Sequence, residues 1–325
     1  MTNVVHVAVG AIRRQGKILI AKRPEHVHQG GCWEFPGGKI EAQESVEQAL
    51  IRELKEELDI EPQNFSPLIQ IPFRYPQKQV LLDVYCIDKF IGDPKGLEGQ
   101  PIQWVDQKDL GKFQFPPANH AILSALSLPQ FYMITPASVG KDFLLKLEES
   151  FKMGISLFQL RHQEIITDFL LDGILGLVEE YHVAMQINSN SWEKYLTRRQ
   201  RNRLLAQHKN DCPIGFHLTS RDLQGRKDYS ELCGLQSASC HTLDDIDLSN
   251  RRQMDFVVVS PVAITSSHPQ QSPLGWEGFK QLCQDAQLPV YALGGMKKND
   301  LGSASRAGAQ GIAAISGLWG NITDV

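Results

Sequence analysis

The first 128 residues alternate short apolar runs with polar turns and contain one long segment of helical periodicity. Apolar runs flank the turn signal Gln15-Gly16, which predicts a hairpin. The pattern predicts strands at residues 4–12, 17–21 and 79–90, and helices at about 45–58 and 118–127. This mixture indicates an α+β domain.

Ser127-Leu128-Pro129-Gln130 interrupts the pattern, and from Phe131 short apolar strands alternate with stretches of helix length. The predicted strands are residues 131–135, 155–161, 183–189, 213–219, 235–240, 255–262, 289–294 and 311–316. Crossovers of helix length favour parallel pairing, and eight parallel strands close a (β/α)₈ TIM barrel. We therefore expect two domains, residues 1–128 and 131–325, the second with a short last helix because the sequence stops at Val325.

Composition supports a soluble two-domain protein. The 325 residues exceed one ordinary domain, and 42% hydrophobic with 22% charged residues is typical of globular chains. A net charge of −4 argues against non-specific attraction to nucleic acid or a membrane. The N-terminus has no secretory pattern and no apolar run spans a bilayer, so we expect a cytoplasmic location. Six scattered cysteines without a CxxC pair predict buried thiols, and nothing in the sequence fixes an oligomeric state.

The long helical segment carries a distinctive set of acids. Glu53, Glu56 and Glu57 stand at i, i+3 and i+4, so their carboxylates share one helix face. Such crowding is unfavourable unless a positive charge lies there, and carboxylate oxygens suit a hard ion such as Mg²⁺. The upstream pair Gly37-Gly38 lets the backbone approach that ion. A solvated acidic face is the plainer interpretation, which we keep for three other acids, Glu41, Glu47 and Glu61.

The full spacing resembles the Nudix box. Its positions are Gly38, Glu44, Arg52, Glu53, Glu56 and Glu57. The resemblance implies Mg²⁺-dependent hydrolysis, or Mn²⁺ in its place, by water attack at the phosphorus of a nucleoside diphosphate derivative. One position departs from the pattern, because Asp59 replaces the usual glycine after the helix. Asp tolerates the left-handed conformation next best, so we expect a weaker cap and an intact site.

The resemblance also implies roles within the box. The cation is expected on Glu53, Glu56, Glu57 and the Gly37 carbonyl, with Glu98 helping when substrate is bound. The catalytic base is left open among Glu53, Glu98 and Glu44. Arg52 is expected to orient Glu53 rather than touch substrate.

Segments outside the box resemble the MutT branch of the family. They are Lys22-Arg23-Pro24, His28, Trp33-Glu34-Phe35-Pro36, Glu98-Gly99-Gln100-Pro101 and Phe115-Pro116-Pro117-Ala118-Asn119. In that branch the asparagine recognises 8-oxoguanine, so Asn119 is the expected specificity residue. Oxidation makes guanine N7 a donor beside the O6 acceptor, and an amide can answer both. Its alternative role is a helix N-cap. The other expected nucleotide contacts are Arg23, His28, Glu34, Phe35, Pro36, Gly37 and Lys78.

Residues 131–325 resemble the thiamine phosphate synthase and TenI family. The expected barrel site, by that resemblance, is Gln159, Arg161, Asn188, Asp222, His241, Gly294, Gly295 and Ser316. The chain departs from the synthase pattern where Gln163 replaces a lysine, Ser189 replaces an aspartate that partners Asp222, and His268 replaces another lysine. These losses weaken pyrophosphate binding. His241 matches the histidine of the TenI-type thiazole tautomerase.

The leading hypothesis is an 8-oxo-dGTP diphosphatase that removes oxidised guanine from the nucleotide pool, with a degenerate or TenI-like barrel. A second reading makes the Nudix substrate a thiamine-pathway pyrophosphate. A third makes the barrel a thiazole phosphate tautomerase, or a module that binds a phosphorylated thiazole-type ligand or mediates assembly without chemistry.

Overall fold

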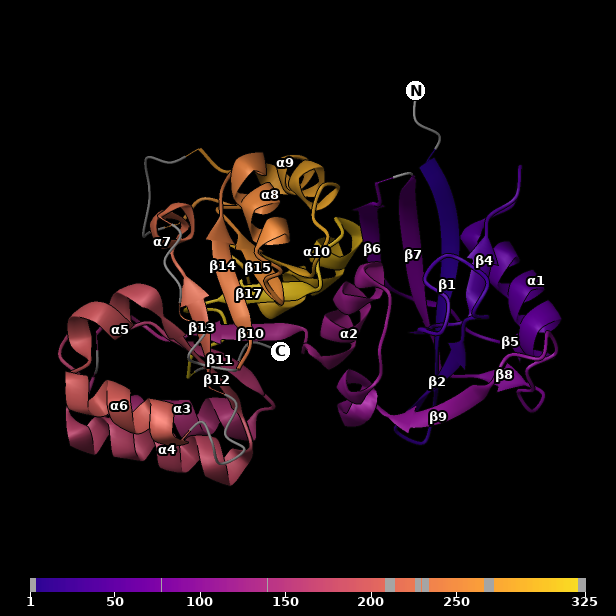
Figure 1. The fold of residues 1–325 in the computed structure, drawn as a ribbon. Coiled ribbons are helices and arrows are strands. Elements are labelled where there is room, and N and C mark those ends of the chain that lie inside the picture. Colours follow the sequence, from indigo (N-terminus) through magenta and orange to yellow (C-terminus); the bar gives the residue numbers. More distant parts are fainter. Residues whose placement is uncertain are drawn as a thin grey trace. The chain divides into compact units, whose positions relative to one another are not determined.

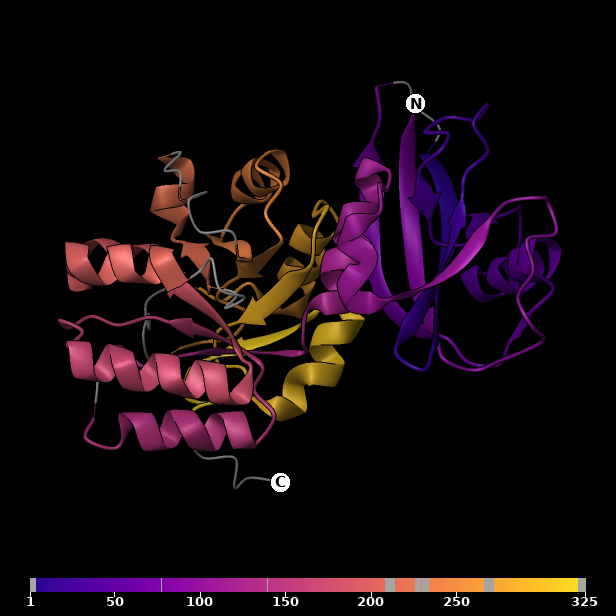
Figure 2. The same ribbon diagram turned by 60° about the horizontal axis from the view of Figure 1, so that its bottom comes forward.

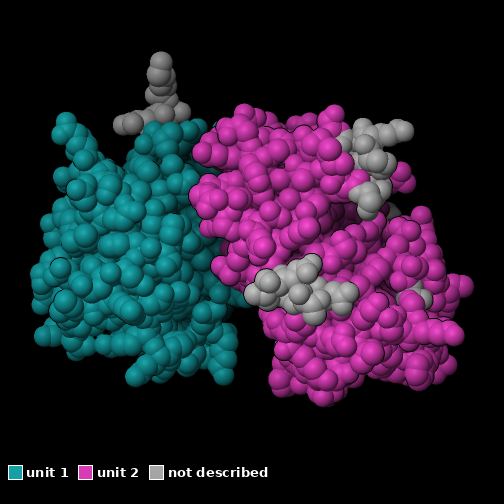
Figure 3. All heavy atoms as spheres, turned by 180° about the vertical axis from the view of Figure 1, so that it is seen from behind, with its two compact units in different colours: residues 1–127 teal, residues 128–325 magenta. Residues whose placement is uncertain are grey.

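The computed structural model describes residues 4–76, 78–138, 140–207, 214–225, 229, 234–265 and 272–320. The chain divides into two compact units, Met1–Ser127 and Leu128–Val325 (Figure 3). No helix among the described residues is long and apolar enough to span a membrane.

The first unit is a mixed sheet with a helix on each face. Its strands are β1 (Val4–Arg14), β2 (Lys17–Lys22), β3 (Trp33–Glu34), β4 (Gly37–Lys39), β5 (Glu61–Pro62), β6 (Ser66–Arg74), β7 (Gln79–Ile87), β8 (Phe90–Ile91) and β9 (Ile102–Asp106). The main order is β3-β2-β1-β7-β6, with β4 paired to β1, β9 paired to β2, and β1 parallel to β7. Strands β5 and β8 form a separate two-stranded antiparallel sheet. Helices α1 (Val46–Leu58) and α2 (His120–Ser127) lie on opposite sides of this sheet (Figure 1).

Alternation along β1 builds the two cores of this sandwich. Ala8 and Ile12 pack with Leu50 and Leu54 of α1, whereas Val9 and Ala11 belong to the cluster that contains Ile122 of α2. A one-residue shift of β1 would exchange these two sets of side chains. The pattern therefore fixes the sheet register beneath α1.

Helix α1 is well defined at both ends. Ser45 and Gln48 form a reciprocal capping box at its start. Asp59 ends it in the left-handed conformation, with φ 57° and ψ 35°, and its carboxylate pairs with Lys55. The position where a glycine was expected thus keeps the glycine-like cap geometry.

The second unit is a closed barrel of eight parallel strands (Figures 1 and 2). The strands are β10 (Phe131–Ile134), β11 (Leu157–Leu160), β12 (Ala184–Asn188), β13 (Ile214–Leu218), β14 (Gln236–Cys240), β15 (Phe256–Val259), β16 (Val290–Leu293) and β17 (Gly311–Ala314). Its helices are α3 (Phe143–Lys152), α4 (Asp168–Tyr181), α5 (Ser189–Tyr195), α6 (Arg198–Gln207), α7 (Ser220–Gln224), α8 (Leu243–Arg251), α9 (Gly275–Cys283) and α10 (Leu301–Arg306). Pairing of β10 with β17 closes the ring.

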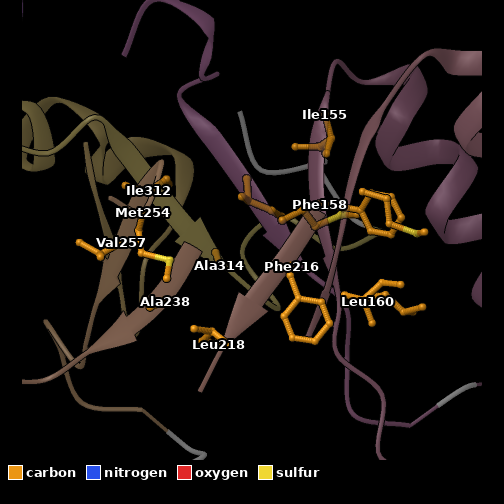
Figure 4. Packing of buried hydrophobic residues seen from close by; sticks show 14 of the residues in the cluster. Ile155, Phe158, Leu160, Phe216, Leu218, Ala238, Met254, Val257, Ile312 and Ala314 are labelled. Carbon is orange, nitrogen blue, oxygen red and sulfur yellow. The ribbon is translucent and has the colours of Figure 1, made fainter. Parts of the chain in front are cut away.

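Outward and inward side chains of the barrel strands form different layers. Phe158 and Leu160 of β11 and Phe216 of β13 belong to the large outer cluster that covers the strands (Figure 4). The inner layer is apolar around Tyr132, Phe256 and Tyr291.

Polar side chains fill the rest of the barrel interior. The Tyr132 hydroxyl lies 2.5 Å from Gln186 Oε1 and accepts from Gln159 Nε2 at 2.8 Å, and Asn188 Nδ2 donates to Gln159 Oε1 at 3.2 Å. Bonded to one another, these amides and this hydroxyl can be buried at little cost.

The TIM barrel and the two-domain α-plus-β organisation predicted from sequence are confirmed, and each observed barrel strand lies inside a predicted one. Two short 3₁₀ helices, η1 (Gln107–Lys112) and η2 (Pro117–Asn119), precede α2, and η3 (Lys298–Asp300) precedes α10. The predicted strand 79–90 stops at Ile87, because the amides of Asp88 and Lys89 bond the Asn64 side chain instead. Strand β6 was not predicted, because Pro67 and Pro72 lie within it and proline argues against a central strand. Both prolines are tolerated because β6 lies at the edge of the sheet.

Candidate functional site

Helix α1 places Glu53 and Glu57 at the border of its buried apolar face and Glu56 toward solvent. Leu50, Leu54 and Leu58 are buried against the sheet. The Glu53 side chain is 16% exposed, whereas that of Glu56 is 63% exposed. Glu53 is therefore held in the fold, and Glu56 reaches into solvent.

Arg52 organises two of the acids. Its Nε and Nη2 atoms donate to the two oxygens of Glu44 at 3.0 and 2.9 Å, and Nη1 donates to Glu53 Oε1 at 2.8 Å. Nη2 also donates to the Lys39 carbonyl at 3.0 Å. The hydrogen bond from Arg52 is the main cause that lowers the pKa of Glu44. Glu44 is thereby engaged in holding Arg52, and the contact expected between Arg52 and Glu53 is present.

Glu57 occupies the centre of an acidic cluster. Its Oε2 accepts from the Gly37 amide at 3.3 Å. Burial raises the pKa of Glu57 to about 8, the Gly37 hydrogen bond opposes this, and the carboxylates of Glu34, Glu53 and Glu98 add to the rise. At neutral pH a proton on Glu57 relieves the repulsion, and a bound cation would do the same.

The two glycines let bare backbone meet these carboxylates. A Cβ atom on Gly38 would lie 2.1 Å from the Glu53 carboxyl carbon. Gly37 has a φ of 142°, and a Cβ there would lie 2.2 Å from the Ala8 carbonyl oxygen. The positive φ and the contact with the β1 backbone require glycine at position 37, and the lack of a side chain on Gly38 lets the Glu53 carboxylate approach the turn.

The residues of this cluster fit a hard divalent cation. Among the described residues, no three His, Cys, Asp or Glu side chains already converge as a coordination shell. The donors are all oxygens, and burial first, with the neighbouring carboxylates adding to it, raises the pKa of Glu57. Small rotations of Glu53, Glu56 and Glu57 toward the Gly37 carbonyl, with Glu98 nearby, would supply ligands for Mg²⁺ or Mn²⁺.

Arg23, His28 and Glu34 form a polar wall beside the acidic cluster. The Arg23 guanidinium pairs with Glu34, and its Nε donates to the His28 carbonyl at 3.1 Å. Burial raises the pKa of Glu34, and the charge of Arg23 opposes that rise. Glu34 connects this wall to the acidic cluster, because its carboxylate also acts on Glu57.

An apolar wall faces the expected base position. The Phe35 ring stacks on Phe115 with centroids 5.4 Å apart and an interplanar angle of 21°. The Pro36 carbonyl, one of the backbone groups expected at the base edge, accepts from the Gly10 amide at 2.8 Å. The Pro36 carbonyl is therefore already hydrogen-bonded within the fold, whereas the Phe35 ring supplies a buried apolar surface.

Asn119 has the environment of a binding residue. It is only 8% exposed, and its side-chain amide makes no hydrogen bond with the part of the chain that the structure describes. It ends η2, which continues directly into α2, and its backbone amide donates to the Pro116 carbonyl. The alternative role as an N-cap is therefore not found.

The barrel has a cavity of about 690 Å³ at the carboxyl ends of its strands. All eight residues expected there line it: Gln159, Arg161, Asn188, Asp222, His241, Gly294, Gly295 and Ser316. Parallel strands bring these residues together although they span most of the unit.

Comparisons with known proteins assign a family to each unit. The family model described as NUDIX domain matches residues 8–125. The 8-oxo-dGTP diphosphatase of Escherichia coli is 39% identical over 123 residues, which are 38% of this chain and 95% of that protein. The model described as thiamine monophosphate synthase matches residues 131–318. The chain joins a Nudix hydrolase to a barrel of the thiamine monophosphate synthase family.

Other relatives set the range of each unit. The Nudix unit is 34% identical to the CTP pyrophosphohydrolase of E. coli over 122 residues, 38% of this chain and 90% of that protein. The barrel is 28% identical to a putative thiamine-phosphate synthase 2 of Aquifex aeolicus over 201 residues, 59% of this chain and 98% of that protein.

The barrel departs from its family at the carboxylate site. Ser189 Oγ, where the synthase pattern has an aspartate, donates to Asp222 Oδ2 at 2.5 Å, and Thr219 Oγ1 donates to the same atom at 2.8 Å. Gln163, in place of the lysine, is exposed. The further replacement at His268 lies outside the described residues. A buried carboxylate that already accepts from two hydroxyls does not fit the divalent cation that the synthase pattern implies.

The tautomer of His241 follows from its contacts. Nδ1 lies 2.7 Å from the Ser260 carbonyl oxygen, which can only accept. Nδ1 therefore carries the hydrogen, and Nε2 of the neutral ring, which has no hydrogen-bond partner among the described residues, can accept a proton in the cavity.

Tyr75 is a site residue of the Nudix unit that the sequence did not reveal. Its ring meets His28 edge-on at 5.1 Å, Lys78 Nζ lies 5.7 Å above it, and its hydroxyl lies close to the Ala118 backbone. Tyr75 therefore ties the segment before Asn119 to the polar wall. An aromatic residue near Lys78 is the only sequence signal, and such residues are common.

His217 is a second missed residue, in the barrel. Its ring nitrogens each lie 2.8 Å from a serine hydroxyl, Ser237 and Ser239. Burial lowers the pKa of His217 to about 3, and the positive charge of Arg161 contributes. A neutral imidazole thus forms part of the cavity floor beside Arg161.

Proposed function

We propose that the Nudix unit hydrolyses 8-oxo-dGTP to 8-oxo-dGMP and pyrophosphate. The observation that carries this proposal is the buried, unbonded amide of Asn119. An amide kept without a partner in the described structure leaves hydrogen bonds to be completed by a ligand. The relatedness to an 8-oxo-dGTP diphosphatase supports the same substrate.

The oxidised base matches this amide. In 8-oxoguanine N7 carries a hydrogen beside the O6 acceptor, so the Asn119 oxygen can accept from one while its NH₂ group donates to the other. In unmodified guanine N7 is an acceptor, and one of these hydrogen bonds is lost. The Phe35 ring would supply an apolar face to the base.

The acidic cluster would perform the hydrolysis. A cation bound there supplies charge stabilisation to the phosphates and lowers the pKa of water. Arg52 keeps Glu53 in place, and both oxygens of Glu44 accept from Arg52, which leaves Glu53 or Glu98 to take the proton from the attacking water. That water attacks phosphorus as the bond to the leaving phosphate oxygen breaks.

Initial rates of hydrolysis test the substrate. We expect kcat/KM to be highest for 8-oxo-dGTP when compared with dGTP, CTP and thiamine diphosphate. The variant Asn119→Ala should reduce the preference for 8-oxo-dGTP over dGTP by roughly 10- to 100-fold. The neighbouring exposed residue provides the control, since His120→Ala should leave that preference unchanged. A preference for CTP or thiamine diphosphate would reject the assignment.

For the barrel we propose proton transfer on a phosphorylated thiazole, because the Ser260 carbonyl fixes His241 with Nε2 as an acceptor. Hydrogen–deuterium exchange on a thiazole phosphate carboxylate, followed by NMR, tests this. The variant His241→Asn should abolish the exchange, while His182→Asn at the end of α4 should not. Exchange that survives in His241→Asn would leave the barrel as a binding module.

A further inference from the structure

Three cationic side chains line the cavity among the described residues: Arg161 is half-buried, whereas Lys194 and Arg221 are exposed. Unused backbone donors lie in the same cavity. Arg161 lies half-buried at the end of β11, and its guanidinium makes no hydrogen bond or ion pair with any described residue. Its backbone is fixed from both sides by Thr135 Oγ1, which receives the Arg161 amide at 2.9 Å and donates to its carbonyl at 3.2 Å. An arginine held in place without a carboxylate partner is arranged for an anionic ligand.

The opposite wall carries backbone donors. Gly294 and Gly295 have φ values of 112° and 69°, and the amides of Gly295 and Ser316 donate to no described residue. A Cβ atom on Gly294 would lie 2.9 Å from Pro261 Cα, so the loop is closely packed and preformed. These two amides come from the loops after β16 and β17, and backbone amides that point into a cavity can bind an anion.

The acidic side of the cavity is already satisfied. Asp222 is 7% exposed, and its Oδ2 accepts from both Ser189 Oγ and Thr219 Oγ1. Ser189 Oγ also accepts from the Thr219 amide at 3.1 Å, so its hydroxyl hydrogen is committed to Asp222. A divalent cation on Asp222 would have to break these hydrogen bonds. The other carboxylate among the described lining residues, Glu193, is exposed and accepts from the Tyr229 hydroxyl.

We propose that the barrel binds a phosphate-bearing anion without a divalent cation, with the Ser189 hydroxyl on Asp222 in the place where a cation would otherwise be needed. Arg161 and the loop amides supply the countercharge. The ligand class is a phosphate monoester or inorganic phosphate, since a pyrophosphate would require the charge of a cation that this site does not hold. This inference concerns binding alone and does not depend on chemistry at His241.

Calorimetric titration of the full chain with inorganic phosphate in EDTA tests the anion site. Chelation silences the Nudix unit, so binding in EDTA reports the barrel. We expect binding that Mg²⁺ does not improve and that Arg161→Gln weakens by roughly 10- to 100-fold. The exposed Arg198→Gln is the matched control and should bind as the wild type does. Absence of binding in EDTA, dependence on Mg²⁺, or full binding by Arg161→Gln would each overturn the proposal.

Mn²⁺ binding, followed by paramagnetic resonance, tests the role of Ser189. In a chain carrying Glu53→Gln and Glu57→Gln, the barrel should hold no Mn²⁺, with or without phosphate. Adding Ser189→Asp should create one Mn²⁺ site that Asp222→Asn removes. If Ser189→Asp does not fold, the parent chain still decides the point, because an Mn²⁺ site there that Asp222→Asn abolishes would overturn the proposal.

Discussion

Glu57 of the Nudix unit and Asp222 of the barrel are both carboxylates shielded from solvent beside a proposed phosphate position. The groups that surround them differ in charge and in hydrogen-bonding capacity. Glu57 has one weak backbone donor and three acidic neighbours, and its pKa rises to about 8. Asp222 accepts from two hydroxyls within 2.8 Å. The first carboxylate lacks positive charge, whereas the second has its hydrogen bonds supplied by the protein.

A cation site and the remnant of one differ in the hydrogen-bond donors that surround their carboxylates. Counting carboxylates in the sequence suggests both places, but counting the donors around each carboxylate separates them. A cation stabilises a cluster that the fold leaves repulsive, and it gains little where hydroxyls already satisfy the oxygens. Substitutions at and around Glu57 and Asp222 test this difference between the two sites.

The largest effect is expected from neutralising each carboxylate. Glu57→Gln should lower kcat for 8-oxo-dGTP by roughly 10²- to 10⁴-fold, because it removes charge from the acidic cluster. Asp222→Asn in the barrel should leave that rate unchanged. Pyrophosphate release with Mg²⁺ measures both, and equal losses in the two variants would contradict the separation of the sites.

Replacement of Arg52 should have a smaller effect. Arg52→Lys keeps the charge but cannot hold Glu44 and Glu53 together, so we expect a loss of roughly 10- to 100-fold in kcat/KM. Arg13 provides a control, since it makes a similar two-pronged contact with Asp88 at an exposed position. Arg13→Lys should change kcat/KM little; if it matches Arg52→Lys, the effect is one of stability.

The two units should respond to pH with opposite signs. In the folded, chelated protein Glu57 keeps its proton up to about pH 8, whereas the unfolded chain releases it near 4.5, so stability falls as pH rises through this window. His217 stays neutral in the fold to about pH 3 but is protonated below 6.5 when unfolded, so stability falls as pH drops from 6.5.

Urea unfolding in EDTA between pH 4 and 8.5 measures these slopes, each at most about 1.4 kcal/mol per pH unit. Glu57→Gln should flatten the alkaline side and His217→Asn the acidic side. Unchanged slopes in these variants would show that other groups are responsible.

Tyr75 should contribute a few-fold effect. Tyr75→Phe removes the polar contact of the hydroxyl with the Ala118 backbone but keeps the ring contacts, so the segment that carries Asn119 becomes less fixed. We expect selectivity for 8-oxo-dGTP over dGTP to fall by roughly 3- to 10-fold with little change in dGTP hydrolysis. Tyr85→Phe, on the α1 face of the same sheet, is the control; selectivity lost equally there would point to general loosening.

The smallest effect concerns two helix ends. Asp59 ends α1 and His182 ends α4, each in the left-handed conformation. Glycine at either position should stabilise its unit by at most about 1 kcal/mol, and less for Asp59→Gly, which loses the pairing with Lys55. Thermal unfolding measures both variants, and destabilisation by His182→Gly would contradict the argument.

The barrel was the part of the fold that the sequence predicted best, because its eight strands repeat one pattern and close into a ring. Eight apolar runs separated by helix-length crossovers led directly to the barrel, because inward and outward alternation has few other solutions. The turn at Gln15-Gly16 was also predicted correctly, and both residues adopt positive φ there. Strand β6 was missed because its prolines conceal an edge strand.

The site was less readable than the fold. The box spacing located the acids, but only the structure shows that Arg52 holds Glu44 with both of its side-chain arms. Tyr75 and His217 depend on contacts between distant segments, which spacing along the chain does not encode. Ser189 looked like a simple loss in sequence, and the structure shows that it has gained a partner in Asp222.

Closure of the barrel has a consequence for synthesis on the ribosome. Strand β10 at Phe131–Ile134 must pair with β17 at Gly311–Ala314, and Tyr291 and Gln310 bond the backbone of Pro129 and Leu128 at the same seam. At about 5–20 residues per second, β10 waits roughly 10 to 35 s for its partner. The strands of the Nudix unit all precede residue 107 and its last helix ends at Ser127, so this unit can be complete while the barrel is still an open sheet with an unpaired edge. Nascent chains should therefore acquire hydrolase structure first and need chaperone protection only for the second half.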